Sequence, residues 1–339
     1  MGAIYIKHIE LKGLFGYRNV SWDVHRDVNI LGGANGSGKS TLFHVCNQLL
    51  GYGYLIDPVL ARKIEQAEIT FDNDYKMTWD KQSVSKQFKK VKGYVYHNVE
   101  DGKVNADGSF LVQRVRLTDN RGDVIHPDEI VLKVPTDIVS SFDQVIREFQ
   151  KVSDPKKNET DTEDRTYLDK LLTESIAFRN AKISQILLSS LSSVMGAGDK
   201  VTGHQITISD KDAQYIMLFR KAMEEFFGSY YEIKGDMESK ITLISRKTNE
   251  EIPYQDLSLG EKEILLLILH VSNSYDLPVI FWLDEPDLGL HVDWQIKLVN
   301  CLRNLNPNIQ LFVSTHAPSM VEGHFGKVTE MSQITEERQ

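Results

Sequence analysis

Apolar positions along the chain follow the two periods expected of an α/β protein. Alternating or fully apolar runs predict strands at residues 5–14, 20–24, 28–31, 277–283 and 309–314. Apolar residues recurring every three or four positions predict helices at residues 40–50, 167–194, 210–227, 256–273 and 293–305. Strands and helices follow one another at both ends of the chain, which is typical of an α/β fold.

The middle of the chain has a different pattern. Strand-like runs occupy residues 69–79, 93–98, 110–117, 124–134 and 229–245, whereas residues 56–68 favour no single element. Residues 151–165 carry many charges and only one aliphatic side chain, so we expect an exposed linker there. We therefore predict one split domain, residues 1–80 with 230–339, and an insertion, residues 81–229, that is part strand and part helical lobe.

Composition limits the class of protein. With 41% hydrophobic residues among 339, the chain can bury a substantial core. Its 39 Lys and Arg against 48 Asp and Glu give a net charge of −9, which disfavours a protein that coats nucleic acid, although a local basic patch stays open. Cys46 and Cys301 lie in predicted helices without metal-ligand spacing, so we expect buried free thiols. The start of the chain lacks a signal core and no apolar run has membrane length, so we expect a cytoplasmic protein without a membrane partner.

Residues 33–40 read G-x-x-x-x-G-K-S, between a predicted strand and a predicted helix. In this pattern glycines allow a tight turn whose backbone N–H groups point at phosphate, and the helix offers its positive end to the same anion. Lys39 would reach the outer phosphates of ATP, and the Ser40 hydroxyl would ligate Mg²⁺. The expected ATP-binding residues of this loop are Gly33, Asn35, Gly36, Ser37, Gly38, Lys39, Ser40 and Thr41.

A second feature is the pair of carboxylates that follows the apolar run at residues 279–283. We expect Asp284 at the end of a buried strand beside the P-loop in a parallel sheet, where it would hold Mg²⁺ through water. Glu285 would polarise the attacking water as general base. A D-E pair after a hydrophobic strand is common by chance. It becomes a strong indication of a nucleotide-hydrolysing site only together with the P-loop.

Two further segments complete the candidate site. Ser258 and the backbone N–H of Gly260 open a predicted helix and could bind a γ-phosphate, or Ser258 could simply cap that helix. His316 follows the strand predicted at residues 309–314 and could contact the γ-phosphate, or it could be an ordinary loop residue. We take Glu285 and His316 as the candidate catalytic residues, and Ser40 and Asp284 as the candidate metal ligands.

In order, G-A-N-G-S-G-K-S, L-S-L-G-E-K, F-W-L-D-E-P-D-L-G-L-H and S-T-H-A-P resemble the motifs of ATP-binding cassette ATPases of the RecF, SMC and OLD class. The run D-E-P-D-L-G-L-H-V-D-W-Q resembles the AAA/ABC-like ATPases of bacterial anti-phage systems, such as PtuA of Septu and retron-associated ATPases. The resemblance implies a P-loop NTPase of the ABC-ATPase type, with a mixed sheet, flanking helices and an inserted, mainly helical lobe. The split domain would then be the ATPase head.

Carried over to this chain, the resemblance implies a role for each motif. ATP and Mg²⁺ would be bound between two heads of a head-to-head dimer, each signature loop completing the site of its partner. Leu259 departs from transporter ATPases, which have a glycine there, and Gln144 is the candidate for a Q-loop. Phe15 and Tyr17 could pack on adenine, or equally in the core or on the surface. The implied motifs are Walker A (residues 33–41), signature (Ser258, Gly260, Glu261, Lys262), Walker B (Asp284, Glu285), D-loop (His291) and switch (His316).

Three functions compete. The first is an ATPase that regulates a separately encoded effector, a nuclease or toxin, in an anti-phage complex, since we find no nuclease pattern after residue 316. The second is a RecF-like DNA clamp in DNA repair, for which a nucleic acid would be a partner. The third, a transporter ATPase, is disfavoured by the signature and by the long insertion.

Overall fold

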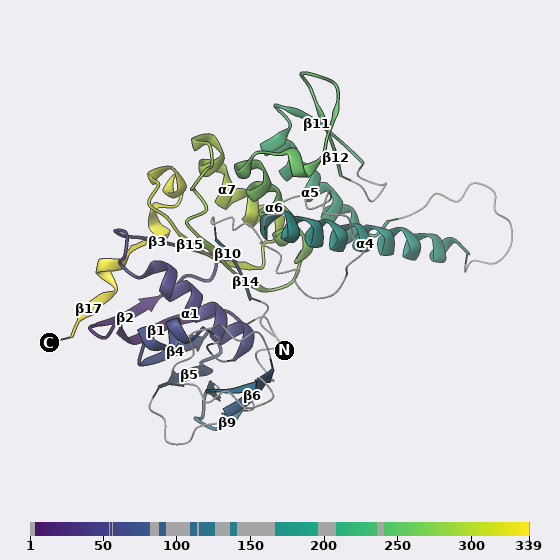
Figure 1. Ribbon diagram of the computed structural model, residues 1–339. Helices are drawn as coiled ribbons and strands as arrows, with labels where there is room; N and C mark the ends of the chain where they lie inside the picture. Colours follow the sequence, from purple (N-terminus) through teal and green to yellow (C-terminus); the bar gives the residue numbers. More distant parts are fainter. Residues whose placement is uncertain are drawn as a thin grey trace, which may run out of the picture. The chain divides into compact units, whose positions relative to one another are not determined.

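A computed structural model describes residues 4–53, 55, 57–81, 88–92, 109–113, 115–125, 136–140, 167–195, 208–235 and 241–338 (Figure 1). The chain divides into two compact units, each made of separate stretches. These units cut the chain at other positions than the motif-based division into residues 1–80, 81–229 and 230–339, which stays a prediction. Unit 1 comprises Met1–Ser140, Leu277–Asp287 and Asn308–Gln339, and unit 2 comprises Ser141–Asp276 and Leu288–Pro307.

Unit 1 contains a five-stranded parallel sheet in the order β10-β14-β15-β3-β16. Every residue of its three central strands is buried, as expected of a parallel sheet covered on both faces. Asp284 lies at the end of a buried parallel strand and beside the P-loop, as expected, since Ser40 Oγ donates to Asp284 Oδ1 at 3.0 Å. The Asp284 strand is not the direct neighbour of the P-loop strand, because β15 lies between them. The strands are β3 (Val28–Gly32), β10 (Thr136–Ser140), β14 (Val279–Asp284), β15 (Ile309–Ser314) and β16 (Val328–Glu330).

A seven-stranded antiparallel sheet in the order β17-β2-β1-β4-β5-β8-β9 also belongs to unit 1. Along β4 and β5 buried residues alternate with residues that are mostly half-buried, which gives the sheet one apolar face. These strands are β1 (Ile6–Leu14), β2 (Arg18–Asp23), β4 (Gln66–Phe71), β5 (Lys76–Asp80), β8 (Arg116–Thr118), β9 (Val124–Ile125) and β17 (Thr335–Glu337), and β6 (Phe88–Lys92) pairs separately with β7 (Ser109–Gln113).

The core of unit 1 joins helix α1 (Lys39–Tyr52) to both sheets (Figure 1). Trp282 of β14 stacks on Phe312 of β15 with ring centroids 4.1 Å apart, and Phe43 of α1 lies 5.1 Å from Trp282. Trp22 of the antiparallel sheet meets Phe312 edge-on at 5.6 Å. This packing fixes the helix that follows the P-loop. The remaining short elements are α2 (Pro58–Lys63), η2 (Pro318–Val321), η3 (Phe325–Lys327) and η4 (Met331–Gln333).

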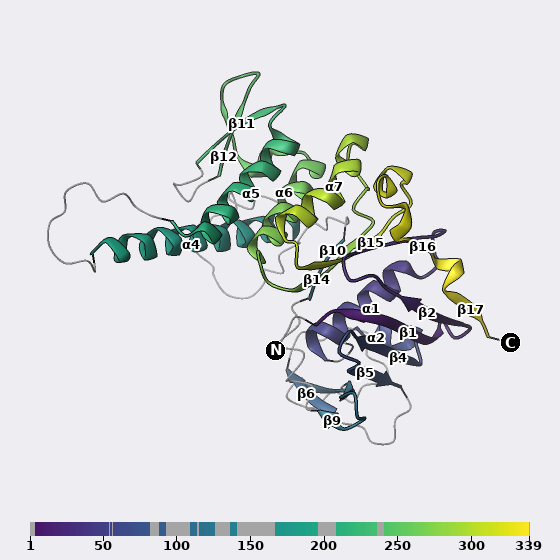
Figure 2. The ribbon, with the colours of Figure 1, turned by 180° about the vertical axis from the view of Figure 1, so that it is seen from behind.

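Unit 2 is mainly helical in its described part (Figure 2). Helix α6 packs against α4, α5 and α7, and Trp294 of α7 lies 5.8 and 6.0 Å from the rings of Phe226 and Phe227 at the end of α5. A small three-stranded sheet precedes α6. The elements are α4 (Tyr167–Met195), α5 (Asp210–Phe227), β11 (Tyr231–Lys234), β12 (Thr242–Ser245), β13 (Glu251–Ile252), η1 (Tyr254–Asp256), α6 (Leu259–Asn273) and α7 (Val292–Leu305).

Most predicted elements are confirmed, and the exceptions have local causes. The strand predicted at residues 69–79 is the hairpin of β4 and β5, turned at Asp74, which has φ 62°. The strand predicted at residues 229–245 is likewise two strands, the antiparallel pair of β11 and β12. Residues 110–117 are divided between β7 and β8, and α6 begins at Leu259 rather than residue 256.

Some predictions fall outside the described residues, namely the strand at 93–98, the linker at 151–165 and most of the strand at 124–134. Both cysteines are buried and free, as predicted, and burial raises the pKa of the Cys301 thiol to about 12. In the part of the chain that the structure describes, every helix is too short or too polar to cross a lipid bilayer.

Candidate functional site

The candidate site of unit 1 lies where three neighbouring parallel strands end. Asp284 on β14 is paired with Ser314 on β15, and Ser314 is paired with Leu31 on β3. The P-loop follows β3, Glu285 follows β14 and His316 follows β15. Because parallel strands end on the same edge of a sheet, residues from three distant stretches meet there.

The P-loop needs glycine at two positions for reasons the structure makes explicit. Gly33 has φ 138° and Gly38 has φ 106°, conformations that side chains with a Cβ rarely adopt. A Cβ on Gly33 would lie 2.9 Å from the Cβ of Met331, and one on Gly38 would lie 2.9 Å from the Cδ2 of Leu14. The backbone therefore turns tightly between the start of α1 and the packed C-terminal segment.

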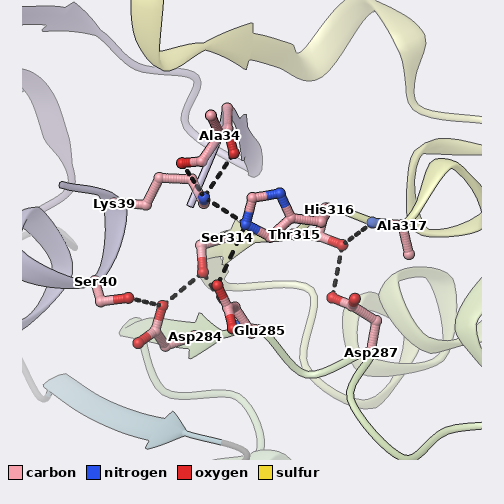
Figure 3. Close-up of polar contacts among 11 residues, drawn as sticks. Ala34, Lys39, Ser40, Asp284, Glu285, Asp287, Ser314, Thr315, His316 and Ala317 are labelled. Carbon is pink, nitrogen blue, oxygen red and sulfur yellow. Dashed lines mark hydrogen bonds and ion pairs between the residues drawn. The ribbon is translucent and has the colours of Figure 1, made fainter. Parts of the chain in front are cut away.

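Lys39, the first residue of α1, points its ammonium group into the loop (Figure 3). Its Nζ donates to the carbonyl oxygens of Gly33 at 2.8 Å and Ala34 at 3.4 Å, and it lies 2.8 Å from Nε2 of His316. Lys39 is only 4% exposed, and this burial lowers its pKa against the opposing pull of nearby carboxylates, Glu285 first among them. The contacts hold the positive charge at the loop, where phosphate would accept it.

Two hydroxyls share one carboxylate oxygen at the end of β14. Ser40 Oγ donates to Asp284 Oδ1 at 3.0 Å, and Ser314 Oγ donates to the same oxygen at 2.6 Å (Figure 3). Hydroxyl and carboxylate oxygens are the hard donors that Mg²⁺ prefers, usually as one or two protein ligands beside substrate phosphates. The described residues hold no cluster of three or more His, Cys, Asp or Glu side chains suited to a metal ion. Ser40 and Asp284 therefore fit an ion shared with a nucleotide better than a metal site built by the protein alone.

Glu285 occupies a strained backbone conformation directly after β14. Its φ of 53° lies in the left-handed region, which costs a residue with a Cβ roughly 1–2 kcal/mol. The backbone N–H of Glu285 donates to the carbonyl oxygen of Ser314 at 3.1 Å and to its Oγ at 3.0 Å. The Glu285 carboxylate lies 3.4 Å from Nε2 of His316. Strain held by buried contacts is typical of functional positions.

His316 sits between the lysine and the carboxylate at the end of β15. A lysine ammonium can only donate, so at 2.8 Å Nε2 of His316 is the acceptor and the proton of a neutral ring lies on Nδ1. The loop before it is fixed by Thr315, whose Oγ1 donates to Asp287 Oδ1 at 2.6 Å and accepts from the N–H of Ala317 at 2.9 Å. We call Lys39, Ser40, Asp284, Glu285, Ser314 and His316 the strand-end cluster.

The other predicted P-loop residues lie around this cluster. Asn35 and Gly36 are exposed at the tip of the loop, and Thr41 is buried in α1. Ser37 Oγ is buried and has no hydrogen-bond partner within the described chain, although buried hydroxyls normally have one. The P-loop backbone, the buried Lys39 ammonium and the Ser37 hydroxyl together form a site suited to binding the phosphates of a nucleotide.

Comparison with known proteins agrees with this geometry. Residues 28–322 match the model of the family described as "AAA domain, putative AbiEii toxin, Type IV TA system", which is most of the chain. The chain belongs to this AAA-domain family. It is thus an ATPase-type domain, as the resemblance implied.

Individual relatives point the same way. The chain is 20% identical to the Septu protein PtuA of Bacillus thuringiensis, over 94% of this chain and 73% of that protein. It is 29% identical to the Retron Vc95 probable ATPase of Vibrio cholerae serotype O1 biovar El Tor, over 32% of this chain and only 24% of that protein. A solved SMC head, bound to the C-winged helix domain of ScpA, superposes with a TM-score of 0.50 at 16% identity, covering 94% of this chain and 92% of that one. At such identity the likeness shows the fold alone, an α/β fold of the SMC-head type.

The predicted signature residues of this AAA-domain chain belong to unit 2. Ser258 caps α6: the N–H of Glu261 donates to Ser258 Oγ at 3.4 Å, and the N–H of Ser258 donates to Glu261 Oε2 at 2.8 Å. Tyr231 OH donates to the other carboxylate oxygen, Glu261 Oε1, at 2.8 Å. We call Ser258, Glu261 and Tyr231 the α6 cap. The capping alternative for Ser258 is therefore observed, and its phosphate role stays a prediction.

Gly260, Lys262 and His291 are also fixed within unit 2. A Cβ on Gly260 would lie 2.7 Å from the carbonyl oxygen of Gly289, so the start of α6 packs closely on the D-loop. Lys262 pairs with Asp169 of α4 at 2.9 Å, and His291 caps α7 through Nδ1, which accepts from the N–H of Asp293 at 3.3 Å.

Two other candidates lie in ordinary core or surface positions. Phe15 packs against the core of unit 1, and Tyr17 is 46% exposed with the Arg18 guanidinium 4.8 Å above its ring. Gln144 lies outside the described residues. Sequence reasoning gave no role to Asp287 in the site or to Met331 beneath the P-loop, and it quoted Ser314 and Thr315 only as neighbours of His316 in the S-T-H run. Ser314 had one signal, a polar residue directly after five residues of a predicted buried strand.

Proposed function

We propose that this chain binds ATP with Mg²⁺ at the strand-end cluster and hydrolyses the γ-phosphate bond. The observation that carries the proposal is the arrangement of Lys39, Ser40, Asp284 and Glu285 at one edge of the parallel sheet. Lys39 would hold the outer phosphates, and Ser40 and Asp284 would hold Mg²⁺. When bound, Mg²⁺ would neutralise charge on the phosphate oxygens.

The remaining side chains suit the hydrolytic step. Glu285 would take a proton from the attacking water, since its carboxylate is fixed close to His316 and is the carboxylate whose charge acts most strongly on Lys39. His316 would contact the γ-phosphate through Nε2, the nitrogen that now faces Lys39 at 2.8 Å, and this nitrogen would then carry the ring proton, because phosphate oxygens only accept hydrogen bonds. Loss of that phosphate would let the lysine and the histidine meet again, so the contact is suited to sensing hydrolysis.

We also propose that two copies form a head-to-head dimer. Ser258 and Leu259 are exposed at the start of α6, so the N–H groups of that helix end are presented to a neighbour. The Ser258 hydroxyl, which now donates to Glu261 Oε2 at 2.7 Å, would turn to the phosphate of the neighbour. In such a dimer each α6 cap would close the nucleotide site of its twin.

The role we propose is that of an ATPase subunit, acting in the cytoplasm, that regulates a separately encoded effector in an anti-phage system. Support comes from the family match and from the names of the relatives, a Septu PtuA and a retron ATPase. The chain spans about a quarter of the retron relative, so what the rest of that protein does is not carried over.

Mixing two inactive variants tests the shared site. Lys39→Ala removes the phosphate-binding lysine, and Ser258→Arg blocks the α6 cap with a bulky side chain. A mixed dimer then has one site with both defects and one site with neither. Because about half of randomly paired dimers are mixed, the mixture should recover about a quarter of the parental ATPase rate, while each variant alone has little.

The outcomes separate the two parts of the proposal. Recovery on mixing supports a site shared between copies. Full activity of Ser258→Arg alone, with Lys39→Ala inactive, would leave an ATPase that works without the α6 cap of a twin. Undiminished activity of Lys39→Ala would contradict the nucleotide site itself.

A further inference from the structure

Ser314 is one of two polar residues on a fully buried strand, the other being Gln310. Ser314 ends β15, follows three apolar residues and is 0% exposed. A buried hydroxyl is costly unless it is hydrogen-bonded, so its partners show what it is for. Both partners that its Oγ meets belong to the strand-end cluster.

One oxygen atom joins the two carboxylate residues of the site. Ser314 Oγ donates its only proton to Asp284 Oδ1 at 2.6 Å and accepts the backbone N–H of Glu285 at 3.0 Å (Figure 3). A hydroxyl has one donor and two acceptor positions, so this arrangement fixes the direction of its O–H bond. The side chains of Asp284 and Glu285 are thereby placed relative to the same atom.

The two hydrogen bonds of Ser314 Oγ fix different parts of the site, the Asp284 carboxylate and the Glu285 backbone. The bond to Asp284 leaves its Oδ1 between two hydroxyls, Ser314 and Ser40, and so sets the carboxylate at the expected metal position. The bond to Glu285 holds a residue at φ 53°, a conformation that its neighbours must impose. This turn directs the Glu285 carboxylate toward His316.

We propose that Ser314 is a positioning residue for ATP hydrolysis, which aligns the metal-binding carboxylate and the general base through one hydroxyl. This inference rests on the proposed function. It assigns to Ser314 no contact with ATP or water. Loss of the Ser314 hydroxyl should therefore weaken Mg²⁺ binding and slow turnover. The affinity for the nucleotide itself should persist, because the P-loop and Lys39 bind its phosphates.

The test compares Ser314→Ala with Ser314→Thr in the full chain. Removal of a partner that orients a metal ligand typically lowers activity or metal affinity by about 10–100-fold. We expect Ser314→Ala to lower kcat in that range with a small change in KM for ATP, and Ser314→Thr, which keeps the hydroxyl, to restore most of it. Ser190→Ala is the matched control, since it removes a buried hydroxyl of unit 2 that donates to the carbonyl oxygen of Ile186 one turn earlier in α4.

A second readout avoids turnover. Equilibrium binding of a fluorescent ATP analogue, titrated with and without Mg²⁺, measures how much the ion strengthens binding. Ser314→Ala should keep the affinity seen without Mg²⁺ and lose most of the gain that Mg²⁺ brings to the parental chain. Thermal unfolding checks that each variant is folded, and Ser314→Cys, a near-isosteric weak donor, serves if the alanine variant unfolds.

The results distinguish this inference from the proposed function. If the parental chain hydrolyses ATP, and Lys39→Ala abolishes binding, but Ser314→Ala matches the parental kcat and Mg²⁺ response, Ser314 is only structural. If the parental chain neither binds nor hydrolyses ATP, the proposed function has failed and the inference falls with it.

Discussion

The strand-end cluster and the α6 cap present polar groups in opposite ways. In the cluster, bonds join residues far apart in the chain, such as Ser40 with Asp284, and Lys39, Asp284 and Ser314 are buried, with Asp284 3% exposed. In the cap, Ser258 bonds Glu261 three residues away and is exposed. The first region depends on the whole of unit 1 being folded, whereas the bond between Ser258 and Glu261 lies within one turn of helix. Changes in the cluster should therefore alter chemistry, and changes in the cap should alter helix stability and what the helix end can offer to a neighbour.

The largest effect is expected from Glu285→Gln. Glutamine keeps the shape of the side chain but is not a base, so kcat should fall by at least about 100-fold while ATP binding persists. The bound, unhydrolysed nucleotide should accumulate a dimer, seen as a shift in size-exclusion chromatography with multi-angle light scattering. Glu336→Gln on the exposed face of β17 is the control. Hydrolysis by Glu285→Gln at the parental rate would remove Glu285 from the role of base.

An intermediate effect is expected at Ser258, where alanine and glycine separate the two roles of the residue. Alanine at an N-cap costs about 1 kcal/mol of stability, whereas glycine costs only a few tenths. Both variants lose the hydroxyl, and a hydrogen bond to a charged group is worth about 1.5–3 kcal/mol, so both should lose roughly 10-fold or more in ATPase rate.

Chemical denaturation and steady-state ATPase assays on the same preparations check this. A rate that follows stability, low for alanine and parental for glycine, would mean that Ser258 acts only as a cap. Equal losses of rate with unequal stabilities would support a contact with phosphate.

The smallest effect concerns the pH dependence of stability at Lys39. Burial lowers its pKa in the folded chain below the unfolded value, so the folded chain releases this proton first as pH rises. At neutral pH the buried charge of Lys39 therefore lowers the free energy of unfolding. This loss disappears as pH rises toward 10.5, because Lys39 is then neutral in the folded and in the unfolded chain. The free energy of unfolding of the parental chain, minus that of Lys39→Met, should increase from pH 7 to pH 10. The contributions of the other titrating groups cancel in this difference. A constant difference would contradict the burial of a charged amine.

Sequence reasoning found the site because its motifs are local. The P-loop, the D-E pair and the S-T-H run are each read within a few residues, and each follows a strand whose apolar pattern is unmistakable. Parallel strands then bring the ends of those motifs together, which is why Lys39, Asp284 and His316 could be grouped in advance.

What it missed depends on contacts that no local pattern records. The order of β14, β15 and β3 follows from packing of whole strands, so the intervening β15 was not foreseen. The left-handed φ of Glu285 is imposed by Ser314 on another strand. The turn at Asp74 interrupts a run whose alternation continues across it, because strands that face the same core keep the same pattern.

The packing of Met331 under Gly33 has a consequence for how the protein is made. Translation proceeds at about 5–20 residues per second, and the loop emerges long before the methionine that supports it. While the polypeptide is still attached to the ribosome, its P-loop therefore lacks the packing of Met331 against Gly33. It also lacks β14 and β15 until nearly all of the 339 residues have been synthesised. Fragments that end early should be unable to grip ATP, so a truncated product cannot compete with the finished protein for nucleotide.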